Sequence, residues 1–210
     1  MLKVLIADDH AMIREGLKQV LRKAFSDAVI GEVQNAEEAL ELIRKKEWDL
    51  AVLDITMPGR SGLDILQDIK LARPKLPVLI MSMHGEDQFA LRVLKAGAAG
   101  FISKHSAPEE LVKAIRKILS GGRYVSASVA EKMVSDLGRE TQNLPHESLS
   151  DRELQVMCMF AMGKTNKQLA QELSLSVKTI STYRARILEK MNMKSNAELT
   201  RYAIKGGLVE

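Results

Sequence analysis

Five short apolar runs alternate with five helical patterns over residues 1–124 and restrict the fold more than any other feature of the chain. The apolar runs lie at 3–7, 28–33, 50–53, 77–82 and 100–103, and the helical patterns lie at 12–24, 36–46, 63–72, 86–96 and 108–119. Strands that are apolar along most of their length are typically covered by helices on both faces. The alternation therefore predicts an α/β fold, a doubly wound five-stranded parallel sheet with right-handed crossovers.

The rest of the chain shows mainly helical patterns, at 151–161, 166–173, 177–191 and 196–204. Ser150 and Glu153 have the spacing of a capping box at the start of the first of these helices. Between the two regions, a short helix ending near Leu137 is followed by a segment without periodicity. We predict an α/β domain over 1–122, a linker with a short helix over 123–147, and a small all-α domain over 148–210.

Composition narrows the class of protein. The chain is 46% apolar and 28% charged, and its apolar runs are far shorter than the ~20 residues that span a bilayer. Asp8, Asp9 and His10 interrupt the first apolar run, which argues against a signal peptide. The single cysteine, Cys158, excludes an internal disulfide and fits a reducing compartment. We therefore expect a cytoplasmic protein that does not enter a membrane.

Polar residues stand at the ends of four predicted strands. Asp8 and Asp9 follow the first strand, Asp54 the third, Ser82 the fourth and Lys104 the fifth. The carboxyl ends of parallel strands meet at one edge of the sheet, where ligands bind. Close carboxylates repel one another unless a cation intervenes, and Mg²⁺ suits such oxygen ligands. One aspartate alone is usually a helix N-cap, but the joint placement favours phosphoryl transfer to a carboxylate.

These residues, together with the runs at 53–59 and 101–104, resemble the receiver domain of two-component response regulators, a flavodoxin-like fold. The resemblance covers 1–122 and implies that Asp54 accepts a phosphoryl group from a sensor histidine kinase. It also implies the following roles: Mg²⁺ held by Asp9, Asp54 and the carbonyl of Thr56, with Asp8 assisting through water; Ser82 and Phe101 at the switch positions; and Lys104 on the phosphoryl oxygens. Met83 and His84 depart from the commonest pattern of the family.

The segment 166–191 reads as a helix-turn-helix with a positive charge excess around it. Seven basic and two acidic side chains lie between Gly163 and Lys194. In the helix at 177–191, one apolar stripe is expected to face the domain core while small polar and basic residues occupy the other faces, as a helix that enters the major groove requires. The pattern alone also fits an ordinary solvated helix.

Residues 148–208 resemble the LuxR-type DNA-binding domain, on motifs that include 149–153, 165–170 and 178–180. A receiver followed by this domain is the layout of the NarL/FixJ class of response regulators. The resemblance implies base contacts from Ser181, Thr182 and Ala185, and phosphate contacts mainly from Lys178, Arg184 and Arg186. The surface that we assign to DNA also includes Thr179, Tyr183 and Lys190, and Tyr183 stands where many relatives have histidine.

The sequence thus predicts a transcriptional regulator that binds double-stranded DNA, as a homodimer when Asp54 is phosphorylated, and that is not an enzyme. One rival is a Mg²⁺-dependent phosphatase on a doubly wound sheet. That rival needs an acid two residues after the nucleophile, where Thr56 stands. Another rival keeps the DNA-binding domain but uses the receiver as an unphosphorylated interaction domain, and the intact acidic cluster argues against it.

Overall fold

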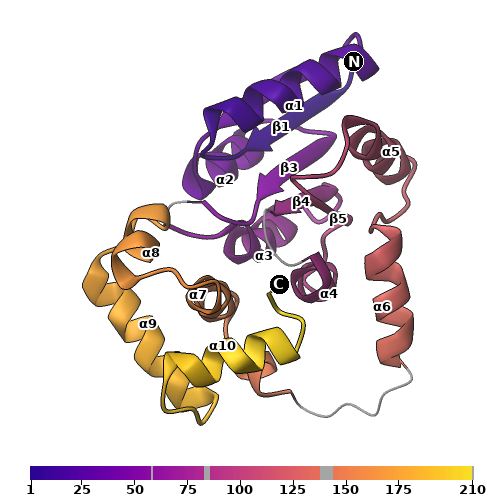
Figure 1. Cartoon of the computed structure of the whole chain (residues 1–210). Helices are drawn as coiled ribbons and strands as arrows, with labels where there is room; N and C mark the ends of the chain where they lie inside the picture. Colours follow the sequence, from indigo (N-terminus) through magenta and orange to yellow (C-terminus); the bar gives the residue numbers. More distant parts are fainter. Residues whose placement is uncertain (58, 83–85, 138–143, 210) are drawn as a thin grey trace. The chain divides into compact units, whose positions relative to one another are not determined.

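The computed structural model describes residues 1–57, 59–82, 86–137 and 144–209 (Figure 1). The chain divides into two compact units, Met1–Asp136 and Leu137–Glu210, which we describe separately. Met83 and His84, and residues 138–143 of the predicted linker, lie outside the described residues. In the described part of the chain, every helix is too short or too polar to cross a membrane.

The described residues of the first unit form a five-stranded parallel sheet, which confirms the predicted α/β fold. The strands are β1 (Lys3–Ala7), β2 (Val29–Val33), β3 (Leu50–Asp54), β4 (Val78–Ser82) and β5 (Gly100–Ser103). The helices are α1 (Ala11–Ala24), α2 (Ala36–Lys45), α3 (Gly62–Ala72), α4 (Glu86–Lys95) and α5 (Pro108–Leu119). In the strand order β2-β1-β3-β4-β5, the chain adds β2 on one side of β1 and then β3 on the other side. The position between β1 and β3 is therefore the topological switch point, where ligands bind in such sheets.

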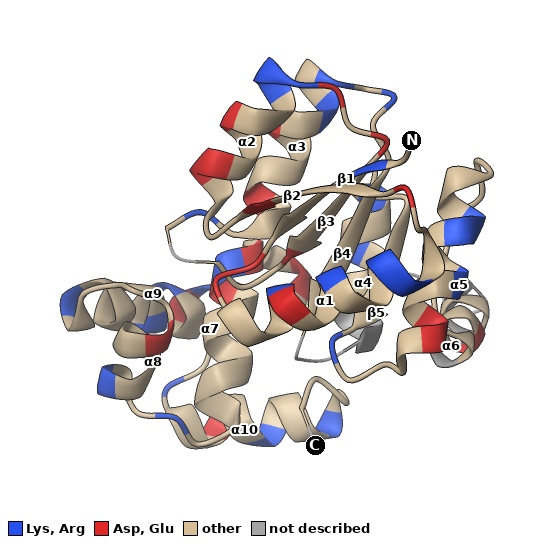
Figure 2. Cartoon of the chain, turned by 90° about the horizontal axis from the view of Figure 1, so that it is seen from above, with Lys and Arg blue, Asp and Glu red and all other residues tan. Residues whose placement is uncertain are grey.

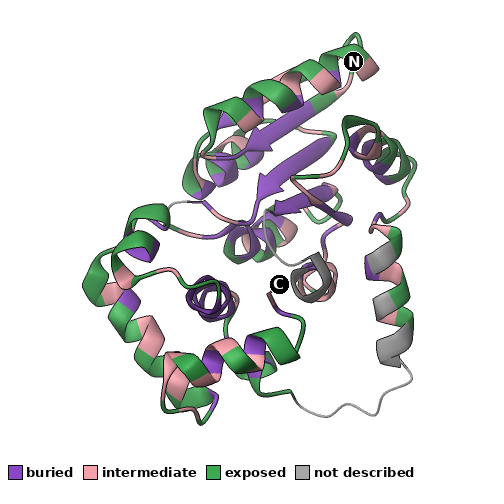
Figure 3. Ribbon diagram, in the orientation of Figure 1, coloured by how far each residue is buried: buried purple, intermediate pink, exposed green. Residues whose placement is uncertain are grey.

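Burial on both faces explains why the central strands β3 and β4 are almost wholly apolar. Every residue of β3 and β4 is buried (Figure 3). On one face, alternate strand residues such as Val4 and Val52 form a core with Leu17 of α1 and Ile115 of α5. On the other face, α2 and α3 pack against each other. Helices thus cover both faces of the sheet, and its carboxyl edge is left to carry polar side chains.

The segment after α5 returns to the sheet before the next helix begins. Tyr124 forms a parallel bridge with Gly100 at the edge of β5, and its side chain is buried in the core. Helix α6 (Ala127–Leu137) follows.

The second unit is helical in its described residues. A 3₁₀ helix, η1 (Pro145–Ser148), precedes α7 (Asp151–Ala161), α8 (Asn166–Glu172), α9 (Val177–Lys190) and α10 (Asn196–Lys205). Helices α9 and α10 both pack against α7, and α8 packs against α9. The capping box of Ser150 and Glu153 starts α7 as predicted, Thr165 and Gln168 form another at α8, and Ser176 caps α9.

The structure differs from the sequence prediction just before α7. The sequence predicts no regular structure there, whereas η1 is ordered and His146 is buried, with its Nδ1 2.7 Å from the hydroxyl oxygen of Tyr202 in α10. A single 3₁₀ turn that starts with Pro145 is too short to produce a 3.6-residue pattern, so periodicity does not detect it. His146 therefore contacts α10 within the second unit.

Candidate functional site

The polar residues predicted at the strand ends do meet at the carboxyl edge of the sheet. Asp8 directly follows β1, Asp54 ends β3, Ser82 ends β4 and Lys104 directly follows β5. Asp8 and Asp54 are each 2% exposed, and Ser82 is 1% exposed. Buried charged groups are rare unless they have partners, so each charge in this cluster needs one.

Lys104 holds two of the buried carboxylates together. Its Nζ lies 2.6 Å from Asp8 Oδ2 and 2.9 Å from Asp54 Oδ2, and all three side chains are almost fully buried. Burial raises the pKa of Asp54 to about 6; Lys104 opposes this rise, and the negative charge of Asp8 adds to it. Burial alone would lower the pKa of Lys104, but the carboxylates of Asp54 and Asp8 outweigh it and raise that pKa. The lysine is therefore charged and directed at the aspartate predicted to react.

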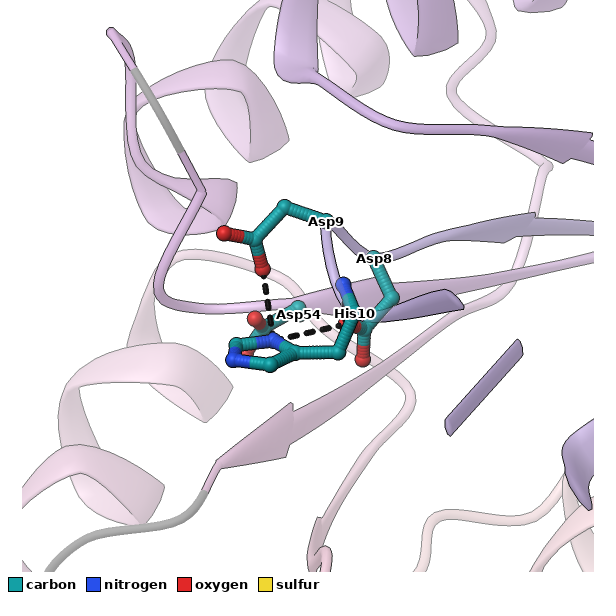
Figure 4. A group of neighbouring side chains, drawn as sticks. All are labelled: Asp8, Asp9, His10 and Asp54. Atoms are coloured by element: carbon teal, nitrogen blue, oxygen red, sulfur yellow. Dashed lines mark hydrogen bonds and ion pairs between the residues drawn. The ribbon is translucent and has the colours of Figure 1, made fainter. Parts of the chain in front are cut away.

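His10 belongs to the same cluster, and the sequence analysis assigned it no role. Its Nδ1 lies 2.7 Å from Asp9 Oδ1 and 3.2 Å from Asp8 Oδ1, as the dashed lines in Figure 4 show. Its backbone N–H also donates to Asp8 Oδ1 at 2.8 Å. His10 is the N-cap residue of α1 but makes no side-chain cap, and Asp8 is not a cap at all. The adjacency of His10 to the two aspartates was the available signal.

The backbone around β3 shapes the same site. Thr56 N–H donates to Asp54 Oδ1 at 3.0 Å, which orients the carboxylate. A Cβ on Gly62, at the start of α3, would stand 2.2 Å from the carbonyl oxygen of Asp54, so only glycine fits there. Ser61 and Asp64 close a capping box at this helix start. The role of the Thr56 carbonyl stays a prediction.

The donor set fits a divalent cation. Asp9 Oδ1 and Asp54 Oδ2 are buried and make no aligned hydrogen bond, although each has an ion-pair contact, with His10 and Lys104 respectively. One potential ligand atom from each of Asp8, Asp9, His10 and Asp54 lies within 4.8 Å of the others. Several carboxylate oxygens at this separation are the ligands that Mg²⁺ prefers.

The two predicted switch residues, Ser82 and Phe101, are both buried. Phe101 in β5 is 1% exposed. Ser82 pairs with Ser103 in the β4–β5 ladder, and its carbonyl accepts the backbone N–H of Lys104 at 2.8 Å. The backbone of Lys104 is therefore hydrogen-bonded to the end of β4.

Arg14 supports the site from α1, a role that was not predicted from the sequence. This arginine is 7% exposed, and its Nη1 donates to the backbone carbonyl of Asp8 at 2.7 Å, while its Nε donates to Glu32 at 3.3 Å. A buried arginine with these partners positions the turn that carries the two aspartates. The available signal was a cation next to the apolar stripe of α1, at Ile13 and Leu17.

In the second unit, α9 presents the predicted DNA-contacting residues around a buried stripe. Ile180 and Ile187 are fully buried, and Figure 2 shows Lys and Arg along α9. The exposed members are Lys178, Ser181, Thr182, Ala185, Arg186 and Lys190, whereas Thr179, Tyr183 and Arg184 are half-buried. The chain thus places most of the predicted residues on the accessible part of one helix.

Several of these side chains have partners within the unit. Arg184 Nε donates to Asn196 Oδ1 at 2.7 Å, which fixes α9 to the start of α10. Lys190 Nζ lies 2.6 Å from Glu153 Oε2. The hydroxyls of Ser181 and Thr182 donate to the carbonyls of Val177 and Lys178. Arg184 and Lys190 therefore have structural roles, whereas the side chains of Lys178 and Arg186 form no hydrogen bond or ion pair with the described residues.

The first unit has a buried cluster of aspartates and a lysine on a doubly wound sheet, and the second unit has a helix-turn-helix. This combination defines the class of phosphorylation-controlled regulators. Residues 4–116 match the family described as response regulator receiver domain, and residues 147–203 match the bacterial regulatory proteins of the luxR family. This chain belongs to the two-component response regulators that join a receiver to a LuxR-type DNA-binding domain.

Full-length relatives agree. The chain is 36% identical over 209 residues to the response regulator UvrY of Escherichia coli, covering 99% of this chain and 96% of the relative. It is 35% identical over 211 residues to the response regulator GacA of Pseudomonas aeruginosa, covering 100% of this chain and 99% of the relative. A solved complex of the two-component response regulator RcsB with DNA matches with 25% identity and a TM-score of 0.60, covering 96% of each chain.

Proposed function

We propose that Asp54 is the phosphoacceptor of this response regulator and that its phosphorylation controls DNA binding by α9. The observation that carries the proposal is the position of Lys104 Nζ, 2.9 Å from Asp54 Oδ2 in a buried site at the carboxyl edge of the sheet. A cation held there neutralises charge on an incoming phosphoryl group.

The proposed reaction is a single transfer. A carboxylate oxygen of Asp54 attacks the phosphorus of a phosphohistidine on a sensor histidine kinase, so an O–P bond forms while the P–N bond breaks and its electrons return to the imidazole. Lys104 leaves the Asp54 carboxylate and pairs with a phosphoryl oxygen. The product is the phosphorylated chain itself, so Asp54 acts as acceptor without turnover.

Mg²⁺ is the proposed cofactor. Asp9, Asp54 and the carbonyl of Thr56 would hold it, and Asp8 would assist through water. When bound, the ion neutralises charge on the phosphoryl oxygens. Arg14 holds the Asp8 backbone in place through its 2.7 Å hydrogen bond, which positions the turn that carries Asp8 and Asp9.

Ser82 and Phe101 report the modified state to the rest of the molecule. The Ser82 hydroxyl bonds to the phosphoryl group, and Phe101 adjusts its packing beside it. The protein then binds double-stranded DNA in the cytoplasm as a homodimer. Ser181, Thr182 and Ala185 meet base edges, Lys178 and Arg186 meet phosphates, and Thr179, Tyr183, Arg184 and Lys190 border this surface.

Labelling by acetyl phosphate tests the proposal. Wild-type protein with Mg²⁺ should shift to a phosphorylated species, and Asp54→Asn or chelation of the metal should prevent the shift. Asp27→Asn, an exposed aspartate of the same unit, serves as the matched control and should label normally. The phosphorylated protein should bind operator DNA with ~5–150-fold higher affinity, the usual range of allosteric coupling. Undiminished labelling of Asp54→Asn would overturn the site.

A further inference from the structure

A basic pocket lies at the edge of the sheet opposite to Asp54. Its volume is about 480 Å³, within the range of small-molecule sites. The wall is made by residues that directly precede β4 and β5, by α3 and by the turn after α5. The charged residues of its lining are Asp49, Lys70, Lys75 and Arg123.

Among the described residues, Lys70, Lys75 and Arg123 form no ion pair with a carboxylate. The carboxylate that does line the pocket, Asp49, accepts the backbone N–H of Lys3 at 2.7 Å. Lys70 Nζ donates to the carbonyl of Leu76 at 2.7 Å, which leaves further donors of its ammonium for a ligand.

The positive charges of Lys70 and Arg123 repel each other. Burial lowers the pKa of Lys70, and the positive charge of Arg123 lowers it further. Lys75 and Arg123 are exposed and Lys70 is half-buried, so all three remain accessible to a counter-ion of opposite sign.

We propose that this pocket binds a small molecule that carries one or two phosphate groups. The three cations outnumber the single carboxylate of Asp49, so the pocket has a net positive charge that suits a multivalent anion. The planar guanidinium of Arg123 suits paired phosphate oxygens, and the two ammonium groups add point charges.

The pocket lies next to a strand contact that reaches the receiver switch. Residues 121–123 line it, and Tyr124 follows directly. Tyr124 donates its backbone N–H to the Ala99 carbonyl at 2.9 Å, and its own carbonyl accepts the N–H of Phe101 at 3.0 Å. Its hydroxyl donates to Glu110 at 3.1 Å. An anion bound to Arg123 would thus restrain the turn that precedes this contact. The backbone hydrogen bond of Tyr124 to Ala99 should then open less often.

Calorimetric titration of the full chain with inorganic pyrophosphate in Mg²⁺-free buffer tests the site. We expect saturable binding at one site, weakened about tenfold or more in Arg123→Gln and in Lys70→Gln, since each loses a charge-assisted hydrogen bond. Lys113→Gln on α5 removes the same charge from an exposed position, and Lys178→Gln removes it from the DNA-binding helix. Both controls should bind as the wild type does, and so should Asp54→Asn.

Two further measurements locate the ligand and separate binding from folding. Hydrogen exchange at the Tyr124 amide should slow when pyrophosphate is bound. Arg123→Gln should unfold at the wild-type temperature or above, because it removes a repulsion with Lys70. The absence of saturable binding, equal weakening by Lys113→Gln, or unchanged exchange at Tyr124 would overturn the proposal. None of these results depends on phosphorylation of Asp54.

Discussion

The ammonium of Lys190 lies 2.6 Å from Glu153 Oε2, and this ion pair joins the end of α9 to the capping box of α7. Glu153 is 3% exposed, so its charge depends on partners within the protein. The same oxygen accepts the backbone N–H of Ser150 at 2.8 Å. One carboxylate therefore both starts α7 and holds the helix that we assign to DNA.

Lys190→Met should destabilise the protein by about 1–3 kcal/mol, because it leaves a buried carboxylate with fewer partners. Burial favours the neutral form of Glu153, but Lys190 and Ser150 outweigh it and lower its pKa. A lowered folded-state pKa gives stability that is present above the ordinary value of 4.5 and is lost as pH falls through the folded value. The loss caused by the mutation should accordingly shrink in acid. Urea denaturation measures it, with the exposed Lys167→Met as control; equal stability of both variants at neutral pH would contradict the role of the pair.

Asp54→Asn should stabilise the metal-free protein at alkaline pH. The pKa of Asp54 is raised to about 6 from 3.8, so the stability linked to its neutral form is present below 3.8 and is lost as pH rises through 6. Asparagine avoids this loss, and its advantage should grow by about 1 kcal/mol between roughly pH 5 and pH 8. Unfolding in urea with a chelator measures the difference. A pH-independent difference would show that Asp54 is not held as the structure indicates.

Lys104→Met should make folding depend on Mg²⁺. Without metal, Asp8 and Asp54 lose their shared cation, and a broken buried pair costs about 3 kcal/mol or more. A metal that binds only the folded state raises its stability by mass action. The increase in thermal midpoint on adding MgCl₂ should be larger for Lys104→Met than for wild type, while Lys113→Met should match wild type. The same increase in all three proteins would count against a metal among these carboxylates.

The two arginines of α9 should behave differently when replaced by alanine. Arg186→Ala should reduce the slope of log affinity for DNA against log salt by about one unit and leave stability unchanged. Arg184→Ala should also lower the thermal midpoint, because it loses the 2.7 Å bond to Asn196. Lys205→Ala, exposed at the end of α10, is the control. If Arg186→Ala changed sequence preference without changing the slope, the assigned orientation of α9 would be wrong.

The sequence by itself determined the elements and the chemistry of the acidic edge. Five mostly apolar strands between amphipathic helices admit few arrangements, because each apolar surface has to be covered and parallel strands need right-handed crossovers. That topology brings Asp8, Asp54 and Lys104 together whatever the details of packing. Local capping signals such as Ser150 with Glu153 act within one helical turn, so they too are readable from the chain.

Only the tertiary structure decided the partners of the long side chains. Arg14 bonds to Asp8, Arg184 to Asn196, and Lys190 to Glu153, 37 residues away. The spacing in the chain does not predict such contacts, because each depends on how two elements are packed and on which rotamer then reaches a partner. The basic pocket has the same origin: Lys70, Lys75 and Arg123 lie on separate segments, and only the folded sheet places their charges around one space.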